Sequence, residues 1–195
     1  MANYQAVSAV SSALIGLLKE HAPLNEFGKL DFAVFHVSDY DQPKIKDGFS
    51  ICLYRVAISG SNPNLQPRRT ANNRQYRPSL PLDLYYLLTP WSGDPIKQHL
   101  MLAWAMRFLE DMSVIQTGIL NNYAPNTFGT TENIEFVRDP LPINDFFNLW
   151  DKLKPKMQTS MTYVARMVLI DSQVEHAGAV PVQTRGNTAG TGESS

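Results

Sequence analysis

A chain of 195 residues with a formal net charge of −1 can form one domain with a substantial core, and it has no overall field that would draw it to nucleic acid or an anionic membrane. Hydrophobic residues make up 44% and charged residues 18%, which excludes wholesale disorder. A single cysteine, Cys52, excludes an internal disulfide and a cysteine-rich zinc site. The sequence begins without the pattern of a secretory signal, and its longest apolar run is too short to cross a bilayer, so we expect synthesis in the cytoplasm.

The first part of the chain predicts a helix, two strands and a long loop. Apolar residues recur at helical spacing over 4–20, and Asn3 is a suitable N-cap. Residues 32–38 predict a strand. Residues 48–59 predict a second strand that is apolar on both faces and therefore interior to a sheet. The following segment, 60–79, is rich in Asn, Pro and Arg and predicts a loop.

A strand, a tight corner and a long helix are predicted next. Apolar side chains alternate over 80–89, Asp94 is a good N-cap, and Pro95 suits the first helical position. The helix extends to about Asp111. Its apolar surface is so broad that we expect burial on most sides or contact with a partner. That surface comprises Ile96, Leu100, Met101, Trp104, Ala105, Phe108 and Leu109.

The last third of the chain predicts a strand, a short helix and a second, longer strand. Residues 132–137 predict the first strand, and 160–171 predict an interior strand because both of its faces are apolar. Asn144 is expected to cap the helix between them. The predicted inner face of that helix is Phe146, Phe147, Trp150 and Leu153. Residues 114–131 follow no recognisable period.

This order of elements predicts an α+β fold. We expect a mixed or mostly antiparallel sheet, a long buried helix with two further helices packed on the sheet, and an extended C-terminal tail. Residues 1–172 are expected to form the folded domain. Residues 173–195 are rich in Gly, Thr and Ser, and they form a low-complexity tail that cannot bury enough apolar surface to order itself.

No catalytic, cofactor-binding or metal site is predicted. Ser92, in the corner between strand and helix, lacks the preceding glycine of a nucleophile elbow. The four histidines follow no metal-binding spacing. Asp39, Asp41 and Asp47 only faintly resemble a calcium loop, because Lys44 stands where that loop needs glycine. We therefore expect no enzymatic activity and no cofactor.

The loop at 60–79 is the most informative polar feature, because no acidic residue occurs between Arg55 and Asp83. One interpretation is an electropositive finger that docks on an acidic partner protein. The alternative is a solvated, mobile insertion. Nucleic acid is a weaker partner, because Tyr76 is the only aromatic residue in the loop. The partner-docking residues would be Arg68, Arg69, Arg74 and Arg77.

Three stretches together resemble one protein family. They are "SICLYRV" with the Asn/Pro/Arg loop after it, "LPLDLYYLLTPWSGDPIKQHLMLAWAMRFLEDMSVI", and "NDFFNLWDKLKPKMQTSMTYVARMVLIDS". With the N-terminal helix, they resemble the cap, or tube-terminator, family of phage-tail-like contractile injection systems of the antifeeding-prophage and virulence-cassette type. The resemblance covers roughly residues 1–172, and the family is similar to the tail terminators of contractile phages.

The resemblance implies a structural role in assembly. A hexameric ring would terminate the inner tube at the end distal to the baseplate and anchor the last sheath ring, with the tube protein and the sheath protein as partners and with no nucleic acid or membrane. No family motif assigns an individual residue to these contacts. A strand edge or the tail would suit pairing with an arm of the sheath by β-augmentation. Two alternatives stay open: another phage-type neck or connector ring, and a small cytoplasmic enzyme or ligand-binding domain.

Overall fold

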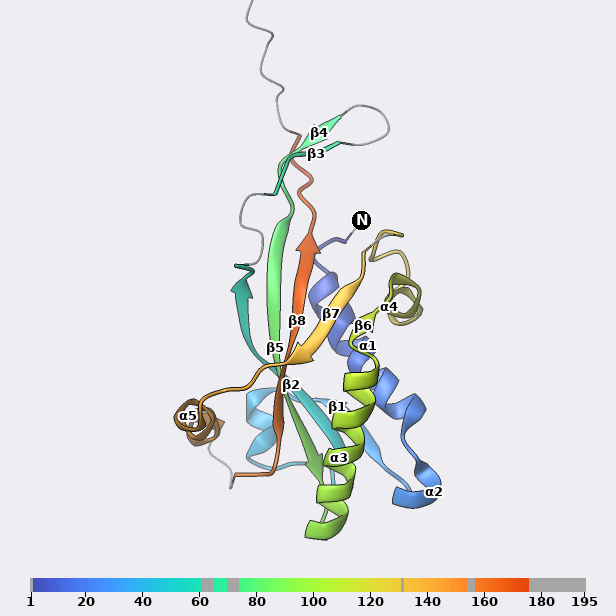
Figure 1. The fold of residues 1–195 in the computed structure, drawn as a ribbon, viewed down its shortest axis with the longest axis vertical. Helices are drawn as coiled ribbons and strands as arrows, with labels where there is room; N and C mark the ends of the chain where they lie inside the picture. Colours follow the sequence, from blue (N-terminus) through green and yellow to red (C-terminus); the bar gives the residue numbers. More distant parts are fainter. Residues whose placement is uncertain (1, 61–64, 70–73, 131, 154–156, 176–195) are drawn as a thin grey trace, which may run out of the picture.

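A six-stranded sheet with the order β1-β2-β5-β8-β7-β6 organises the fold (Figure 1). The computed structural model describes residues 2–60, 65–69, 74–130, 132–153 and 157–175. Every pairing in the sheet is antiparallel except that of β1 with β2, which confirms the expected sheet. The strands are β1 (Asp31–Val34), β2 (Gly48–Ile58), β5 (Leu80–Trp91), β6 (Val114–Ile115), β7 (Ile134–Arg138) and β8 (Met161–Ile170).

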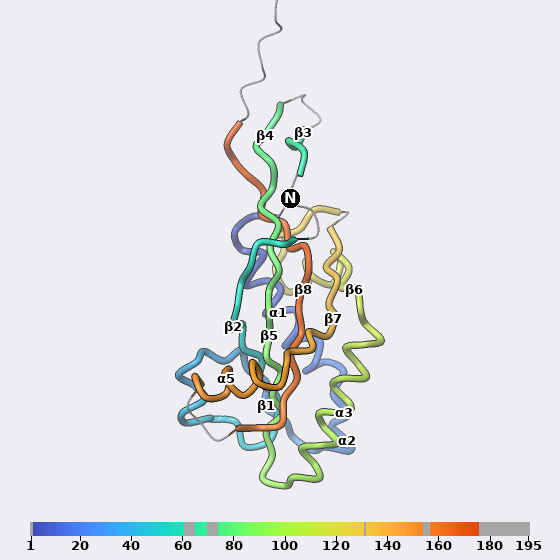
Figure 2. Tube along the Cα trace, turned by 60° about the vertical axis from the view of Figure 1, so that its left-hand side comes forward, coloured from blue at the N-terminus to red at the C-terminus, as the bar shows by residue number. Residues whose placement is uncertain are grey.

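Helices cover the two faces of the sheet unequally. The two long helices, α1 and α3, pack on one face, and the shorter α5 packs on the other with a single 3-10 turn (Figures 1 and 2). This arrangement confirms the predicted α+β class. The helices are α1 (Ala6–His21), α2 (Leu24–Phe27), α3 (Pro95–Asp111), α4 (Thr117–Tyr123) and α5 (Ile143–Leu153), and the 3-10 turn is η1 (Val37–Tyr40).

The alternation of side chains along β5 produces two separate hydrophobic cores. Leu84 and Tyr86 point to the face that α1 covers, where they pack with Leu14. Leu87 points to the opposite face and packs in a second cluster with Trp150 of α5. Each large side chain buried in this way contributes about 1.5–3 kcal/mol, so both cores help to hold β5 at the centre. The predicted interior position of β8 is confirmed. That of β2 is confirmed only for its first half, where β1 pairs with residues 48–51; the second half lies at the edge of the sheet and is largely exposed.

The start of the first helix differs from the prediction. The N-cap position of α1 is Gln5, whose side chain makes no capping hydrogen bond. Asn3 lies two residues earlier, and its side-chain oxygen accepts a 2.7 Å hydrogen bond from the backbone N–H of Gln5. Asn3 therefore stabilises the turn that leads into the helix and is not its N-cap.

The long helix α3 is buried on one face only. Met101, Ala105 and Leu109 lie one turn apart and form its inner stripe. Ile96 and Leu100, which the sequence grouped with the apolar surface, are 67% and 52% exposed. Of the two interpretations of that broad surface, burial on most sides is wrong, and an apolar stripe open to contact remains.

The short helix α5 is also oriented differently from the prediction. Trp150 and Leu153 are buried and Phe146 packs against the same core, as expected. Phe147 is about half exposed, because a residue one step from Phe146 is rotated by about 100° around the helix. Asn144 lies inside the helix and is not its cap; the first helical hydrogen bond runs from the N–H of Phe146 to the carbonyl oxygen of residue 142.

Two segments were misread or unread in the sequence. The predicted strand at 32–38 ends at Val34, because the chain turns into η1, where the Asp39 carboxylate accepts a 2.7 Å hydrogen bond from the N–H of His36. Within the unread segment 114–131, the structure places β6 and α4. Neither of these short elements was predicted, because polar residues interrupt any helical or strand period in this segment.

Candidate assembly surfaces

The corner between β5 and α3 is a structural joint. The hydroxyl of Ser92 donates a 2.7 Å hydrogen bond to Asp47, in the segment before β2, and Lys97 lies 3.3 Å from the same carboxylate. The hydrogen bond from Ser92, together with Lys97, lowers the pKa of Asp47 below its ordinary value. Asp94 caps α3 as predicted, accepting a 2.9 Å hydrogen bond from the N–H of Ile96. These polar groups thus fix the start of α3 against the segment before β2.

The described part of the chain offers no constellation for metal binding. No three His, Cys, Asp or Glu side chains within it lie together in a way that could hold an ion. His21 instead stacks on Phe108 at 5.0 Å between ring centroids. Cys52 is buried, and burial raises the pKa of its thiol to about 11, which makes it a poor nucleophile at neutral pH. Within the described ranges, no helix is both long and apolar enough to cross a membrane.

A groove of about 450 Å³ lies between α3 and β7. Its lining includes Phe136, Val137 and Met161, and an ion pair with a 3.0 Å separation joins Glu110 of α3 to Arg138 of β7. The ion pair ties the helix to the edge of the sheet.

The predicted arginine loop contains a short hairpin that extends beyond the end of the sheet. Its strands are β3 (Arg68–Arg69) and β4 (Gln75–Tyr76). The chain after β8 runs beside β4, so that Tyr76 pairs with Glu175 and the N–H of Arg77 donates to the carbonyl oxygen of Val174 (Figures 1 and 2). The projection therefore consists of three chain segments, two from the hairpin and one from the end of the described chain.

Acidic residues from the C-terminal segment face two of the four predicted arginines. Arg74 forms a 3.1 Å ion pair with Glu175, and the guanidinium of Arg68 lies 3.7 Å from Asp171 and over the ring of Tyr76. Arg69 and Arg77 are exposed, as is Arg74. Four arginines and two facing acids leave two positive charges in excess, so the projection is basic, but less so than the sequence suggested.

Asp171 is the residue that fastens the projection to the body of the protein. Its carboxylate accepts a 2.5 Å hydrogen bond from Ser79, the residue before β5, and faces Arg68 of the hairpin. Its backbone N–H donates to the carbonyl oxygen of Ala2 at 2.8 Å. One side chain and its own amide thus hold together the hairpin, β5, the end of β8 and the N-terminal segment.

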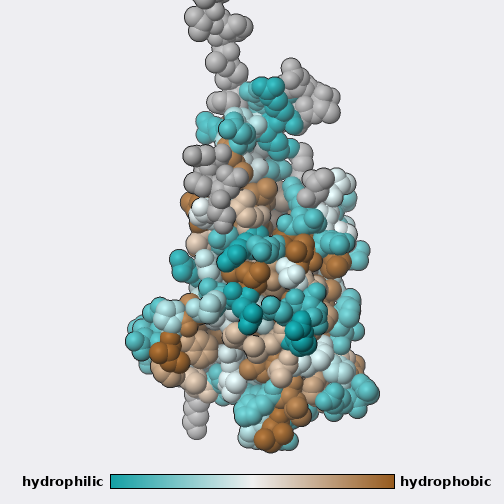
Figure 3. Space-filling model, viewed as in Figure 1, coloured by the Kyte–Doolittle hydropathy of each residue, from teal (hydrophilic) through white to brown (hydrophobic). Residues whose placement is uncertain are grey.

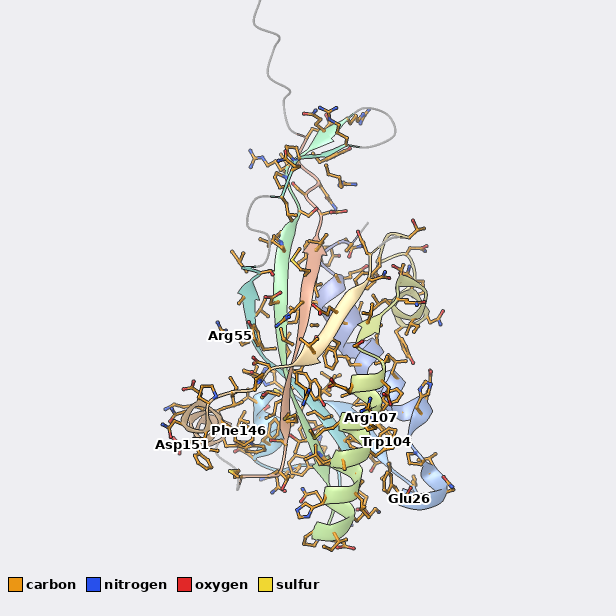
Figure 4. The ribbon with its side chains drawn as sticks, in the orientation of Figure 1. Glu26, Arg55, Trp104, Arg107, Phe146 and Asp151 are labelled. Carbon is orange, nitrogen blue, oxygen red and sulfur yellow. The ribbon has the colours of Figure 1, made fainter. Side chains whose placement is uncertain are left out.

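Apolar side chains are exposed at the opposite end of the molecule. Ile96 and Leu100 lie in the first turns of α3, where Figure 3 shows a hydrophobic area at the lower end of the molecule. Trp104, one turn further on (Figure 4), is partly buried, and its ring meets that of Phe27 of α2 edge-on, with 6.3 Å between the ring centroids. A second exposed pair, Ile143 and Phe147, lies on α5.

The open part of the sheet face next to β2 carries charged and aromatic side chains. The guanidinium of Arg55 lies 4.8 Å from the ring centroid of Tyr85 on β5. Asp83, two residues before it, accepts a 3.1 Å hydrogen bond from the N–H of Met167, which has a positive φ of 57°. Asp83 therefore stabilises the irregular register between β5 and β8 at this point. It acts as a structural residue.

A family model described as the Pvc16 N-terminal domain matches residues 9–184. The chain belongs to this family. The resemblance to cap and tube-terminator proteins noted in the sequence is thereby confirmed. No curated protein matches the chain.

Two solved structures share the fold of this family member. One is the sheath/tube terminator of an extracellular contractile injection system, PVC, in its extended state. It matches with a TM-score of 0.59 and 17% sequence identity, and the match covers 98% of this chain and 66% of that one. The other is the tube-terminating cap of the anti-feeding prophage: TM-score 0.61, 14% identity, 92% of this chain and 60% of that one covered. The chain thus spans less than two thirds of the length of either protein.

Sequence reasoning on this family member selected the four arginines as partner-docking residues, which stays a prediction, and it missed the two acidic residues that face Arg68 and Arg74. Asp171 and Glu175 are about a hundred residues from the hairpin they face, and the sequence offers no periodic signal for such a pairing. For the exposed end of α3, the only indication in the sequence was that the apolar surface of the helix is too broad for a single buried face. Of the low-complexity tail predicted at 173–195, residues 173–175 are described and reach β4 through Glu175, and residues 176–195 lie outside the described residues.

Proposed function

We propose that this chain caps a contractile injection particle, terminating the inner tube at the end distal to the baseplate. The observation that carries the proposal is the family match over residues 9–184, supported by a fold shared with a sheath/tube terminator and a tube-terminating cap. In this role the protein is structural, and its partners are the tube protein and the sheath protein. It is made in the cytoplasm and becomes part of the assembled particle.

The cap is proposed to be a hexameric ring that also anchors the last ring of the sheath. A closed ring needs a head-to-tail contact between two different surfaces of the same chain, as well as further surfaces for tube and sheath. The arginine hairpin and the exposed end of α3 lie at opposite ends of the long axis of the molecule (Figure 1). Surfaces separated in this way allow one protein to contact different partners at the same time.

Electron microscopy of particles carrying a labelled version of this protein tests the location. We expect label at one tip only, opposite the baseplate. Label at the baseplate, or along the whole particle, would rule out a cap. Recovery of portal or capsid proteins with the labelled chain, in place of tube and sheath proteins, would indicate a connector ring that joins a phage head to its tail.

The arginine hairpin is proposed to contact the tube or the sheath electrostatically. Charge reversal of Arg68, Arg69, Arg74 and Arg77 should abolish capping and leave tubes of uncontrolled length. A sharper variant reverses only Arg69 and Arg77, because it preserves the ion pairs of the other two with Asp171 and Glu175 and so keeps the projection folded.

The matched control for this experiment is the double reversal Lys29→Glu and Lys152→Glu, at two exposed lysines on the body of the protein. The control alters net charge as much as the sharper variant does, but it leaves the hairpin unchanged. Tube lengths measured by electron microscopy should lengthen and spread with the hairpin variant only. Equal length distributions in the two variants would refute a specific role for the hairpin.

A further inference from the structure

The second half of β2 is an open edge of the sheet. β1 pairs only with residues 48–51, so among the residues that the structure describes no strand lies outside Arg55–Ile58 (Figure 1). A bulge at Tyr54 separates this open stretch from the covered one. Natural proteins usually protect such edges, because unpaired backbone groups are a template for another strand.

The hydrogen-bond ladder fixes which backbone groups face outward. The N–H of Ser59 donates to the carbonyl oxygen of Pro81 on β5. Backbone groups alternate along an antiparallel strand, so those of Ala57 also point toward β5, while those of Val56 and Ile58 point away from it. Two N–H groups and two carbonyl oxygens are thus presented at the open edge.

The side chains at this edge are apolar and incompletely covered. Val56 and Ile58 pair with Leu84 and Leu82, so they lie on the face of the sheet that α1 covers. They are nevertheless 49% and 68% exposed. An added strand with two aliphatic side chains on this face would both pair with the backbone and cover them.

The chain itself contains one segment with these properties outside the described residues. In the stretch "AVPVQ", Val180 and Val182 alternate around Pro181. If the N–H groups of the two valines face the open edge, the backbone nitrogen of Pro181 faces away from it. That nitrogen carries no hydrogen to donate, and a proline is tolerated in an edge strand at such a position. The added strand would then resist pairing with yet another strand on its outer side.

The reach of the chain decides which copy receives this segment. Tyr76 of β4 faces Glu175, and Leu82 of β5 faces Ile58, so the edge lies six residues from the last described residue, roughly 20 Å along the chain that leads from β4 into β5. It also lies three strand positions across the sheet, about 14 Å, because β8 and the segment after it are on the far side of β5. Five residues join Glu175 to Val180, and five residues span at most about 18 Å.

We propose that residues 179–183 of one copy add an antiparallel strand to the open edge of β2 in the next copy, with Val180 opposite Ile58 and Val182 opposite Val56. A single chain is too short to make this pairing with itself. Donation from each copy to the next is a head-to-tail contact of the kind that closes a ring. The inference therefore deepens the proposed hexameric cap, on which it rests.

Disulfide trapping between two differently tagged full-length variants tests the pairing. One variant carries Ile58→Cys and the other Val180→Cys, and both keep the buried Cys52. Mixing them should give a covalent dimer that contains both tags, because opposite residues in a strand pair lie within disulfide distance. The matched control is Ala57→Cys, whose side chain points to the other face of the same edge, and it should give at least about tenfold less dimer.

A second pair of variants tests the edge without cross-linking. Ile58→Lys should weaken self-association of the full chain, measured by sedimentation, by about tenfold or more, because a charge replaces a buried aliphatic contact. Ala57→Lys should change it much less. Equal effects of the two substitutions would overturn the proposed pairing.

The outcomes separate this inference from the function. Rings without the specific covalent dimer would overturn strand exchange and leave the cap proposal standing. A cross-link within one doubly substituted chain, or capture of a sheath arm at Ile58→Cys in place of Val180→Cys, would also overturn it. A specific dimer, combined with particles that carry no label at the tip, would support strand exchange and refute the cap.

Discussion

Replacing Gly48 with alanine should destabilise the whole sheet. Gly48 begins β2 directly beside β1, with a φ of 154°, and a Cβ added there would lie 1.9 Å from the backbone oxygen of Asp31. The obstacle is backbone, so relief requires β1 to move away from β2. Strained backbone costs about 1–3 kcal/mol and overpacking about 1–3 kcal/mol, which gives about 2–6 kcal/mol for Gly48→Ala.

Urea unfolding and thermal unfolding, followed by tryptophan fluorescence, measure this effect. A loss of this size lowers Tm by roughly 4–24 °C for a domain of this length, at about 2–4 °C per kcal/mol. Gly93→Ala is the matched control, because a Cβ at Gly93 meets no atom within 4 Å. The control should stay within about 1 kcal/mol of the parent protein. A loss below about 1 kcal/mol for Gly48→Ala would refute the close approach of β1 and β2.

Three further predictions concern the surfaces and the core. Leu100→Ser on the exposed stripe of α3 should change stability by less than about 0.5 kcal/mol, while Met101→Ala on its buried stripe should cost about 2–5 kcal/mol; similar losses in urea unfolding would contradict the orientation of the helix. Asp171→Asn should loosen the hairpin and speed amide hydrogen exchange at Arg77 by about tenfold or more; unchanged exchange would contradict the role of Asp171. Burial raises the pKa of the Cys52 thiol from 9.0 to about 11, so the contribution of this thiol to stability is complete below pH 9 and is lost as the pH rises toward 11. The urea midpoint of unfolding should therefore fall over that range, and it should fall less steeply in Cys52→Ala. Equal slopes in the two proteins would contradict the raised pKa.

Patterns within single elements were sufficient for much of the fold. The strand at 160–171 was correctly predicted to be interior, and so was the first half of the strand at 48–59, because only a strand with neighbours and cover on both faces can bury both sets of side chains. The start of α3 followed from Asp94 and Pro95, because capping depends on adjacent residues. The errors at Asn3, Asn144 and Phe147 are shifts of one or two residues, which local preferences resolve poorly.

By itself, the sequence determined the α+β class, the central strands and the family, because hydrophobic periodicity and local capping are written in neighbouring residues. Only the tertiary structure showed which apolar stripe of α3 stays exposed, that Asp171 and Glu175 face the arginine hairpin, and that β1 is too short to cover Val56 and Ile58. Each of these depends on where segments far apart in the chain meet. Contacts of that kind leave no period in the sequence, and they form the surfaces on which a proposed assembly protein depends.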